Sequence, residues 1–200
     1  MIVVVDYKAG NLKSVETAMQ YLGADFTITD RPEEVVKADK LIVPGVGEAR
    51  AAMENLKSRG LDSALEDFFD SGKFLLGICI GIQLFFERSE ERDTECLGFL
   101  KGKVVRFPEM EGLKVPHMGW NQVEIVRDTH LTRGIESGSS FYFVHSYYPL
   151  PEDEKYIIGE TDYGIRFTSA VQWENLFAVQ FHPEKSGRSG LKLLSNFVSM

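Results

Sequence analysis

The sequence predicts an α/β fold: a three-layer, doubly wound and mostly parallel sheet with added antiparallel strands. In the first half of the chain, short apolar runs alternate with amphipathic stretches, the order expected of a parallel sheet covered by helices on both faces. The second half contains short β-type runs between Gly, Pro and acidic turns, and several of these should pair antiparallel and extend or flank the sheet. The length of 200 residues fits a single domain, 1–200, without an internal repeat or linker.

The elements of the first half follow from hydrophobic spacing. Residues 2–5 form an uninterrupted apolar run, as in a parallel strand that is covered on both faces. Residues 12–22 should form a helix, because their apolar positions fall on one face and Gly23 follows them. The further elements expected here are strands 26–29 and 41–43, helices 49–56 and 61–69, strand 74–78 and helix 80–87.

The second half is read from its β-type composition. Its predicted strands span 104–107, 122–126, 141–144, 156–159, 168–172 and 177–181. A last helix is expected over 190–198, where Leu191, Leu194 and Phe197 have helical spacing.

The composition argues against several classes of function. Hydrophobic residues make up 44% and charged residues 26%, as in a soluble globular protein. The net charge of -8, from 22 basic against 30 acidic residues, argues against a general nucleic-acid surface. No apolar run approaches the roughly 18 residues of a membrane span, and the N-terminus lacks the basic region of a signal peptide. Cys79 and Cys96 are too few for a disulfide framework or a zinc site, and no glycine fingerprint or Walker lysine indicates a nucleotide. We therefore expect a cytoplasmic protein without metal or other cofactor that binds neither nucleic acid nor membrane.

A candidate nucleophile lies at a predicted strand-to-helix turn. Cys79 has Gly77 and Gly81 two positions to either side, the spacing of a nucleophile elbow, where the sharp turn leaves no room for side chains. Such a turn exposes its central side chain at the carboxyl edge of the sheet, the usual ligand position in open α/β sheets. A helix N-terminus also favours the ionised thiol and offers free amides to an oxyanion. The alternative is that Cys79 is a small buried apolar residue, as most free cysteines are.

A candidate base lies about a hundred positions further along. His182-Pro183-Glu184 follows an apolar strand, and Pro183 fixes an extended geometry at His182. In an extended segment residues two apart share a face, so the Glu184 carboxylate can orient the imidazole, as a thiol nucleophile requires. The alternative is a surface turn whose polar side chains face water. His145, at another strand end, is the competing base, although no carboxylate lies near it in the sequence.

Three further segments combine unusual residues. The turn Pro44-Gly45-Val46-Gly47 can bring backbone amides close to a reacting carbonyl, or it is an ordinary turn. Residues 116–121, Pro-His-Met-Gly-Trp-Asn, place Met, Trp and Asn in a predicted loop, a composition enriched at protein interfaces, or they form a satellite core. After the first strand, Asn11 is a candidate helix cap.

Taken in order, these segments resemble the class I (triad-type) glutamine amidotransferases over nearly the whole chain. The run His-Met-Gly-Trp-Asn narrows the resemblance to the glutaminase subunits of imidazole glycerol phosphate synthases, from histidine biosynthesis. Departures from the pattern are mild: Lys8-Ala9 stands where a glycine is common, and Ile80 and Ile82 replace commoner Leu and Met. The segments that carry the resemblance are 6–7, 10–12, 44–47, 77–87, 89–91, 116–121, 143–147 and 180–186.

The resemblance implies a flavodoxin-like fold and the hydrolysis of L-glutamine through a cysteine thioester. It assigns Cys79 as nucleophile, His182 as proton relay and Glu184 as the group that orients His182. It also implies an oxyanion hole formed by backbone amides of Val46, Gly47 and Ile80. The residues that it assigns to glutamine binding are Gln83, Ser146 and Tyr147.

The resemblance further implies a partner. Members of this subfamily form a heterodimer with a TIM-barrel cyclase subunit, which receives the ammonia through an internal passage, and they are typically poor glutaminases until that partner is engaged. The residues expected to face the cyclase are Trp120, Asn121, Lys185 and Ser186. Three other hypotheses stay open: a paralogue that supplies ammonia to another synthase, such as one of surface-sugar biosynthesis, a non-catalytic binding subunit, and a stand-alone cysteine hydrolase.

Overall fold

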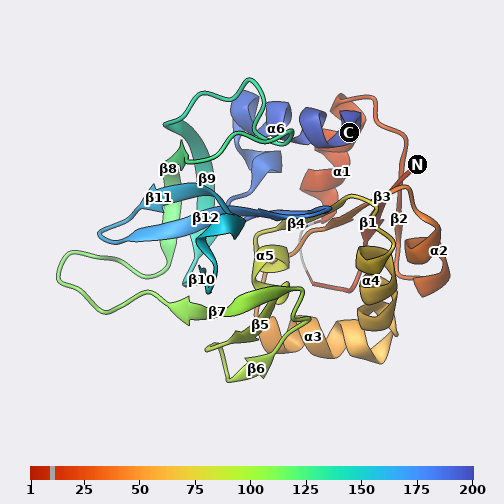
Figure 1. The fold of residues 1–200 in the computed structure, drawn as a ribbon, viewed down its shortest axis with the longest axis horizontal. Helices are drawn as coiled ribbons and strands as arrows, with labels where there is room; N and C mark the ends of the chain where they lie inside the picture. The colour runs from red at the N-terminus through yellow and green to blue at the C-terminus, as the bar shows by residue number, and fades with distance from the viewer. Residues whose placement is uncertain (10–11) are drawn as a thin grey trace.

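The computed structural model describes residues 1–9 and 12–200, and it contains a large sheet with helices on both faces and a smaller sheet beside it (Figure 1). The strands of the first half are β1 (Ile2–Val5), β2 (Phe26–Thr29), β3 (Lys40–Val43) and β4 (Leu75–Ile78). The helices of this half are α1 (Leu12–Tyr21), α2 (Pro32–Lys37), α3 (Ala49–Ser58), α4 (Leu61–Asp70) and α5 (Ile80–Leu84).

The second half is mainly strands. These are β5 (Phe86–Ser89), β6 (Thr94–Glu95), β7 (Leu100–Arg106), β8 (His117–Ile125), β9 (Ser139–His145), β10 (Tyr147–Pro151), β11 (Ile157–Asp162), β12 (Arg166–Trp173) and β13 (Leu176–Val179). Its helical segments are η1 (Glu154–Tyr156), η2 (Pro183–Lys185) and α6 (Gly187–Ser199).

The large sheet has the order β2-β1-β3-β4-β13-β12-β11-β8-β9, and the small sheet the order β10-β7-β5-β6. From β2 to β13 all neighbours pair parallel. From β13 to β9 they pair antiparallel. The predicted α/β class, with parallel strands extended by antiparallel ones, is therefore confirmed.

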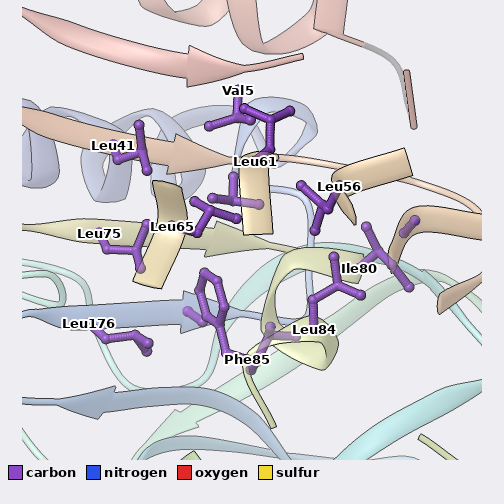
Figure 2. Close-up of a cluster of buried hydrophobic side chains, with 14 of the residues drawn as sticks. Val5, Leu41, Leu56, Leu61, Leu65, Leu75, Ile80, Leu84, Phe85 and Leu176 are labelled. Carbon is purple, nitrogen blue, oxygen red and sulfur yellow. The ribbon is translucent and has the colours of Figure 1, made fainter. Parts of the chain in front are cut away.

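Side chains of β1 alternate between two hydrophobic clusters, one on each face of the large sheet. Val3 and Val5 belong to the first cluster, and Ile2 and Val4 to the second. The first cluster contains buried side chains of α2 to α5 and is shown in part in Figure 2, while the second contains those of α1 and α6. Because each fully buried Leu or Phe side chain contributes about 2 kcal/mol on leaving water, these clusters hold the helices on the sheet. This double burial explains why the strand is apolar at every position.

The expected helix over 80–87 is wrong in its second half. Helix α5 ends at Leu84, and the chain then enters β5, which pairs with β7 and β6. Phe85 and Phe86 are fully buried. These apolar residues pack in the core and in the small sheet, and they do not continue the helix. Pairing with distant strands overrode the local pattern.

The segment expected to be a loop, 116–121, is also different. From His117 onward it belongs to β8, which is paired antiparallel with β9. His117 is buried while Met118 and Trp120 are exposed, which is the alternation of a strand with one face on the core. The alternation could not be read from the sequence, because the exposed positions Met118 and Trp120 are themselves large and apolar.

Besides β5, the elements that were not expected are β6, β10, α2 and the 3-10 helices η1 and η2. Strand β10 contains Pro149 and Pro151 and lies at the edge of the small sheet, where a missing N–H costs little. Helix α2 begins with Pro32, a residue suited to the first helical position. The proposed cap Asn11 lies outside the described residues. Within residues 1–9 and 12–200, no helix has the length and apolar character needed to cross a membrane.

Candidate active site

The sheet order brings three separate chain segments to one edge. Strands β3, β4 and β13 are parallel neighbours, so their carboxyl ends meet there. The turn with Val46 and Gly47 follows β3, Cys79 follows β4, and His182 comes three residues after the end of β13. The backbone N–H of Cys79 donates to the carbonyl of Val179 at 2.8 Å, which ties two of these ends together.

Cys79 occupies a strained and crowded turn. Its backbone has φ 55 and ψ -103, in a region that side-chain-bearing residues rarely adopt. A Cβ on Gly77 would lie 2.5 Å from the Phe85 ring, and one on Gly81 would lie 2.3 Å from the carbonyl oxygen of Val43. Packing therefore requires glycine at both positions, and the thiol is held at the edge of the sheet.

The imidazole of His182 is oriented by a buried carboxylate. Its Nδ1 lies 2.7 Å from Oε1 of Glu184, and the two side chains are only 2% and 3% exposed. Because a carboxylate only accepts, the Nδ1 atom carries the proton, which leaves Nε2 for chemistry. Burial alone would lower the pKa of His182, but the side chains of Cys79 and Glu184 outweigh it and raise the pKa to about 10. Nε2 itself has no hydrogen-bond partner.

The local geometry of this segment differs in part from the expectation. His182 is extended, as Pro183 requires, with φ -98 and ψ 94. Glu184 instead lies in the 3-10 turn η2, so the carboxylate reaches the imidazole by a turn rather than along one face of a strand.

Cys79 opens into a cavity of about 240 Å³. Its walls include Val46, Gly47 and Ile80, the three residues expected to offer amides to an oxyanion. The N–H groups at the start of α5 have no acceptor within the helix, as at any helix N-terminus. Gly47 has φ 118 and open space around its Cα, so the turn has room for a peptide to reorient.

Gln83, Ser146 and Tyr147 line the same cavity. Nε2 of Gln83 donates to the carbonyl oxygen of Tyr147 and to Oε1 of Gln180, both at 3.0 Å. These bonds use both amide hydrogens, so only Oε1 of Gln83 remains to accept from a ligand.

Gln180 is a residue to which sequence reasoning gave no role. Its side chain is fully buried, and its Nε2 lies 3.9 Å from Sγ of Cys79. In the sequence, the feature that could have identified Gln180 is its position in the segment 180–186, two residues before the candidate base His182.

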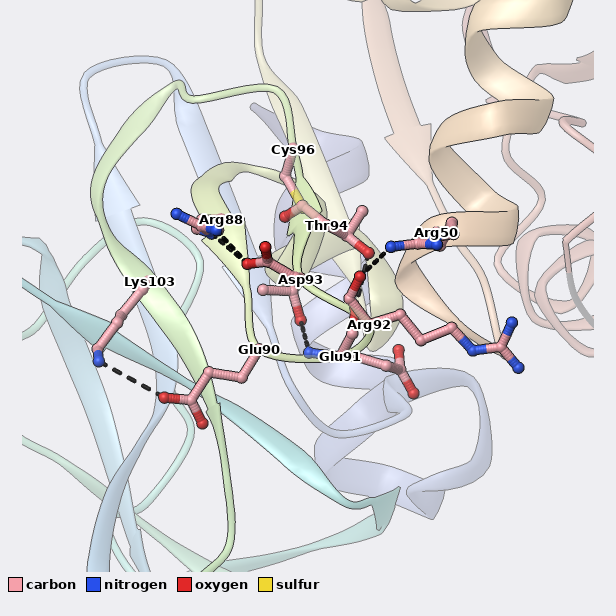
Figure 3. A network of polar contacts seen from close by, with 10 residues as sticks. Arg50, Arg88, Glu90, Glu91, Arg92, Asp93, Thr94, Cys96 and Lys103 are labelled. Atoms are coloured by element: carbon pink, nitrogen blue, oxygen red, sulfur yellow. Dashed lines mark hydrogen bonds and ion pairs between the residues drawn. The ribbon is translucent and has the colours of Figure 1, made fainter.

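Glu91, another cavity residue, was also given no role. It lies in the loop between β5 and β6, where the Arg88 guanidinium pairs with Asp93 (Figure 3). Oε2 of Glu91 accepts from the backbone N–H of Ala49, the first residue of α3, at 2.7 Å, and burial raises the pKa of Glu91. Since α3 follows directly on the turn with Val46, this bond fixes one end of that turn.

His145, the competing base, lines the cavity but is engaged elsewhere. Its Nε2 lies 2.9 Å from Nδ1 of His117, and its Nδ1 lies 2.8 Å from the carbonyl oxygen of Tyr147. Both ring nitrogens are thus occupied by groups other than Cys79.

The residues expected at a partner surface separate into two groups. Trp120 is 59% exposed, and its ring lies 6.2 Å from that of Tyr142, over which Nζ of Lys185 lies at 5.9 Å. Ser186 is buried, and its Oγ donates to the carbonyl of His182 at 2.5 Å and accepts from the N–H of Tyr142 at 2.9 Å. Ser186 therefore anchors the His182 segment to β9 rather than facing outward.

Asn121 is half-buried, intermediate between the exposed Trp120 and the buried Ser186. Its Nδ2 donates to the carbonyl of Asp162 at 2.8 Å, so its amide is held by the protein itself. Among the described residues, no cluster of His, Cys, Asp and Glu could hold a metal ion.

Comparison with known proteins places the chain in a family. Residues 3–200 match the family described as Glutamine amidotransferase class-I. The chain is 52% identical to the imidazole glycerol phosphate synthase subunit HisH of Maridesulfovibrio salexigens, over 98% of this chain and 95% of that one. It is 50% identical to the same subunit of Dehalococcoides mccartyi, over 100% and 97%. A crystal structure described as glutamine amidotransferase shares the fold, with a TM-score of 0.75 at 19% identity and 100% coverage of both chains. The chain therefore belongs to the class-I glutamine amidotransferase family and, within it, to the HisH subunits of imidazole glycerol phosphate synthase.

Proposed function

We propose that this chain is the glutaminase subunit of an imidazole glycerol phosphate synthase in histidine biosynthesis. It hydrolyses L-glutamine to glutamate and ammonia, and it supplies the ammonia to a cyclase subunit. One observation carries the proposal: the thiol of Cys79 meets the buried His182–Glu184 pair at the carboxyl edge of the sheet. Beside them lies a cavity lined by Val46, Gly47, Ile80 and Gln83, and we assign backbone amides of the first three and Oε1 of Gln83 to the substrate.

The first half of the reaction forms a thioester. Sγ of Cys79, its proton given to His182, attacks the side-chain carbonyl carbon of glutamine, and the carbonyl electron pair moves to oxygen. Amides of Ile80 and of the turn with Val46 and Gly47 hold this oxyanion. Because Cys79 and Glu184 raise the pKa of His182, the ring holds the proton that it takes from the thiol and acts first as an acid. Nε2 protonates the amide nitrogen, the C–N bond breaks and ammonia leaves.

The second half regenerates the enzyme. Nε2 of His182, now neutral, accepts a proton from water while the water oxygen adds to the thioester carbon. The new oxyanion collapses, the C–S bond breaks and glutamate is released. Glu184 keeps the other proton on Nδ1, so Nε2 is the atom that exchanges protons in both steps.

The partner surface is proposed to be the outward face of β8 and β9 together with Lys185. Met118 and Trp120 are 62% and 59% exposed, which is unusual for large apolar side chains. Met118 is paired with Val144, and Val144 lines the cavity of Cys79. A TIM-barrel cyclase seated here, in a heterodimer, would cover the mouth through which ammonia leaves. Trp120, Asn121 and Lys185 are assigned to this contact, and Ser186 is left out because it is buried.

The proposal treats residues 1–200 as one catalytic domain that acts in the cytoplasm. Two clusters spanning both faces of one large sheet support a single folding unit. Both cysteines are free, the form that a reducing compartment maintains and that the thioester chemistry requires.

The test is glutamate release from glutamine by the purified chain mixed with the cyclase subunit of the same organism and its nucleotide substrate. Cys79→Ala should abolish the release, whereas Cys96→Ala, in the other free cysteine, should leave it within about twofold, because Cys96 lies outside the cavity. Persistent activity of Cys79→Ala would refute the mechanism. Failure of the gene to restore growth to a histidine auxotroph that lacks this subunit would point to a paralogue.

A further inference from the structure

A line of polar contacts leads from β8 into the protein. Nδ2 of Asn121 lies 3.2 Å from Nε2 of His117, and Nδ1 of His117 lies 2.9 Å from Nε2 of His145. Nδ1 of His145 lies 2.8 Å from the carbonyl oxygen of Tyr147. The mechanism proposed above uses neither histidine.

The direction of every bond in this line follows from its ends. A carbonyl oxygen only accepts, so Nδ1 of His145 donates to Tyr147, and Nε2 of the neutral ring must accept. Nδ1 of His117 therefore donates to His145, which leaves Nε2 of His117 as an acceptor. Asn121 supplies the matching donor: its Oδ1 already accepts from the Gln122 N–H and its Nδ2 also donates to the carbonyl of Asp162.

The surroundings keep both rings neutral. His117 and His145 are 2% and 5% exposed. The ring of His117 stacks on Tyr163 at 3.9 Å and on Phe143 at 4.7 Å, and Phe107 lies 5.2 Å from His145. Burial in this aromatic cage lowers the pKa of His117 to about 4 and that of His145 to about 3.

The line continues to the nucleophile. The Tyr147 carbonyl also accepts from Nε2 of Gln83, which is bonded in turn to Gln180, and Gln180 lies 3.9 Å from Sγ of Cys79. The position of the Tyr147 carbonyl therefore sets the orientation of the Gln83 amide, and with it the one acceptor that Gln83 offers to a ligand. On the other side, Asn121 is next to the exposed Trp120.

We propose that His117 and His145 are positioning residues: a neutral pair, each with its proton on Nδ1, that couples strand β8 to Gln83 and so sets the affinity of the cavity for glutamine. The pair touches neither the scissile bond nor a migrating proton. Its effect on glutamine affinity rests on the proposed function, whereas its proton order is a property of the folded chain alone.

The proton order is tested by nitrogen-15 NMR of the histidine side chains in the full chain at pH 7. Both rings are expected to carry their single proton on Nδ1 and to have a bare Nε2. A proton on Nε2 of either ring, or a charged ring, would overturn the proposal. This measurement needs no glutamine and no partner, so it judges the pair even where the proposed function fails.

The coupling is tested by two replacements of His117 in the complex with the cyclase. His117→Phe retains a ring for stacking on Tyr163 but removes the donor, while His117→Asn loses the ring and keeps a donor close to the place of Nδ1. We expect His117→Phe to raise KM for glutamine about tenfold, the size of one lost buried hydrogen bond, with kcat within twofold. His117→Asn should recover most of that loss. A packing role alone predicts the reverse ranking, and that ranking would refute the coupling.

One control variant and one further variant complete the test. His130→Phe, in an exposed histidine outside the cavity, should leave KM unchanged. Asn121→Ala removes the donor to Nε2 of His117 and keeps both buried rings, so it serves, at saturating cyclase, where His117→Phe does not fold. Asn121→Ala should raise KM as well, and the double variant should be no worse than His117→Phe alone, because both break one line. Additive effects of the two changes would contradict a shared line.

Discussion

Gly81→Ala is expected to separate folding from catalysis at the turn that presents Cys79. The added Cβ would lie 2.3 Å from the carbonyl oxygen of Val43, whereas ordinary contacts begin at 3.4 Å. The backbone at Gly81 or at Val43 must therefore move by about 1 Å. The neighbour is a backbone atom at the end of β3 and cannot rotate away. Overpacking of this kind costs about 1–3 kcal/mol of unfolding free energy, or a fall in Tm of about 2–12 °C.

The effect on catalysis should be much larger. Strand β3 leads directly into the turn with Val46 and Gly47, and a misplacement of about 1 Å in a reacting group costs about 100-fold in rate. We therefore expect Gly81→Ala to remain folded and to lose about 100-fold in kcat. The assay is steady-state glutamate release in the presence of the cyclase and its nucleotide, beside calorimetric melting of the isolated chain.

A second glycine provides the matched control. Gly60 precedes α4 with φ 67, and an added Cβ there meets nothing closer than 3.9 Å. Gly60→Ala should lose about 1–2 kcal/mol through backbone strain alone, with kcat unchanged. A folded Gly81→Ala enzyme whose kcat stays within threefold of the wild type would show that the crowding at Cys79 does not set the geometry of the site.

Three further outcomes are expected. Glu184→Gln should lower the pKa of His182 from about 10, since it removes one of the two partners that raise it, and NMR titration of the ring measures this; an unmoved pKa would contradict the role of the carboxylate. Trp120→Ala should weaken binding to the cyclase by about 2 kcal/mol, as calorimetry would show, without changing the Tm of the isolated chain. Because the pKa values of His117 and His145 are lowered to about 4 and 3, the unfolded chain takes up protons below pH 6.5 that the folded chain does not. Unfolding free energy should thus fall by about 2 kcal/mol per histidine between pH 7 and 5, and urea titrations of His117→Phe should show a shallower loss.

The elements that sequence reasoning located well are those whose pattern is set by local chemistry. Strand β1 was recognised because an apolar run with no polar face suits only a strand covered on both sides. The turn at Cys79 was recognised because Gly77 and Gly81 mark backbone that cannot carry a Cβ. His182-Pro183-Glu184 was recognised because a proline fixes the geometry before it and the carboxylate is only two residues away.

The features that sequence reasoning missed depend on contacts with residues far away in the chain. Phe86 turns from helix to strand because β7 is there to pair with it. Ser186 turns inward because β9 offers the N–H of Tyr142, 44 positions away. Glu91 acts on the turn with Val46 through a bond to Ala49, which is 42 positions distant. No local signal encodes such contacts.

By itself, then, the sequence determined the α/β class, the glycine-flanked turn at Cys79 and the pairing of His182 with Glu184, since each follows from short local patterns. Only the tertiary structure decided that Cys79 and His182 share one edge, because that follows from the insertion of β13 beside β4. It likewise decided how His145 is engaged: Nδ1 of His117, 28 positions away, lies 2.9 Å from the His145 Nε2 atom that a base would need. Hydrogen-bond capacity is a local property, but which partner uses it is fixed by the packing of the whole chain.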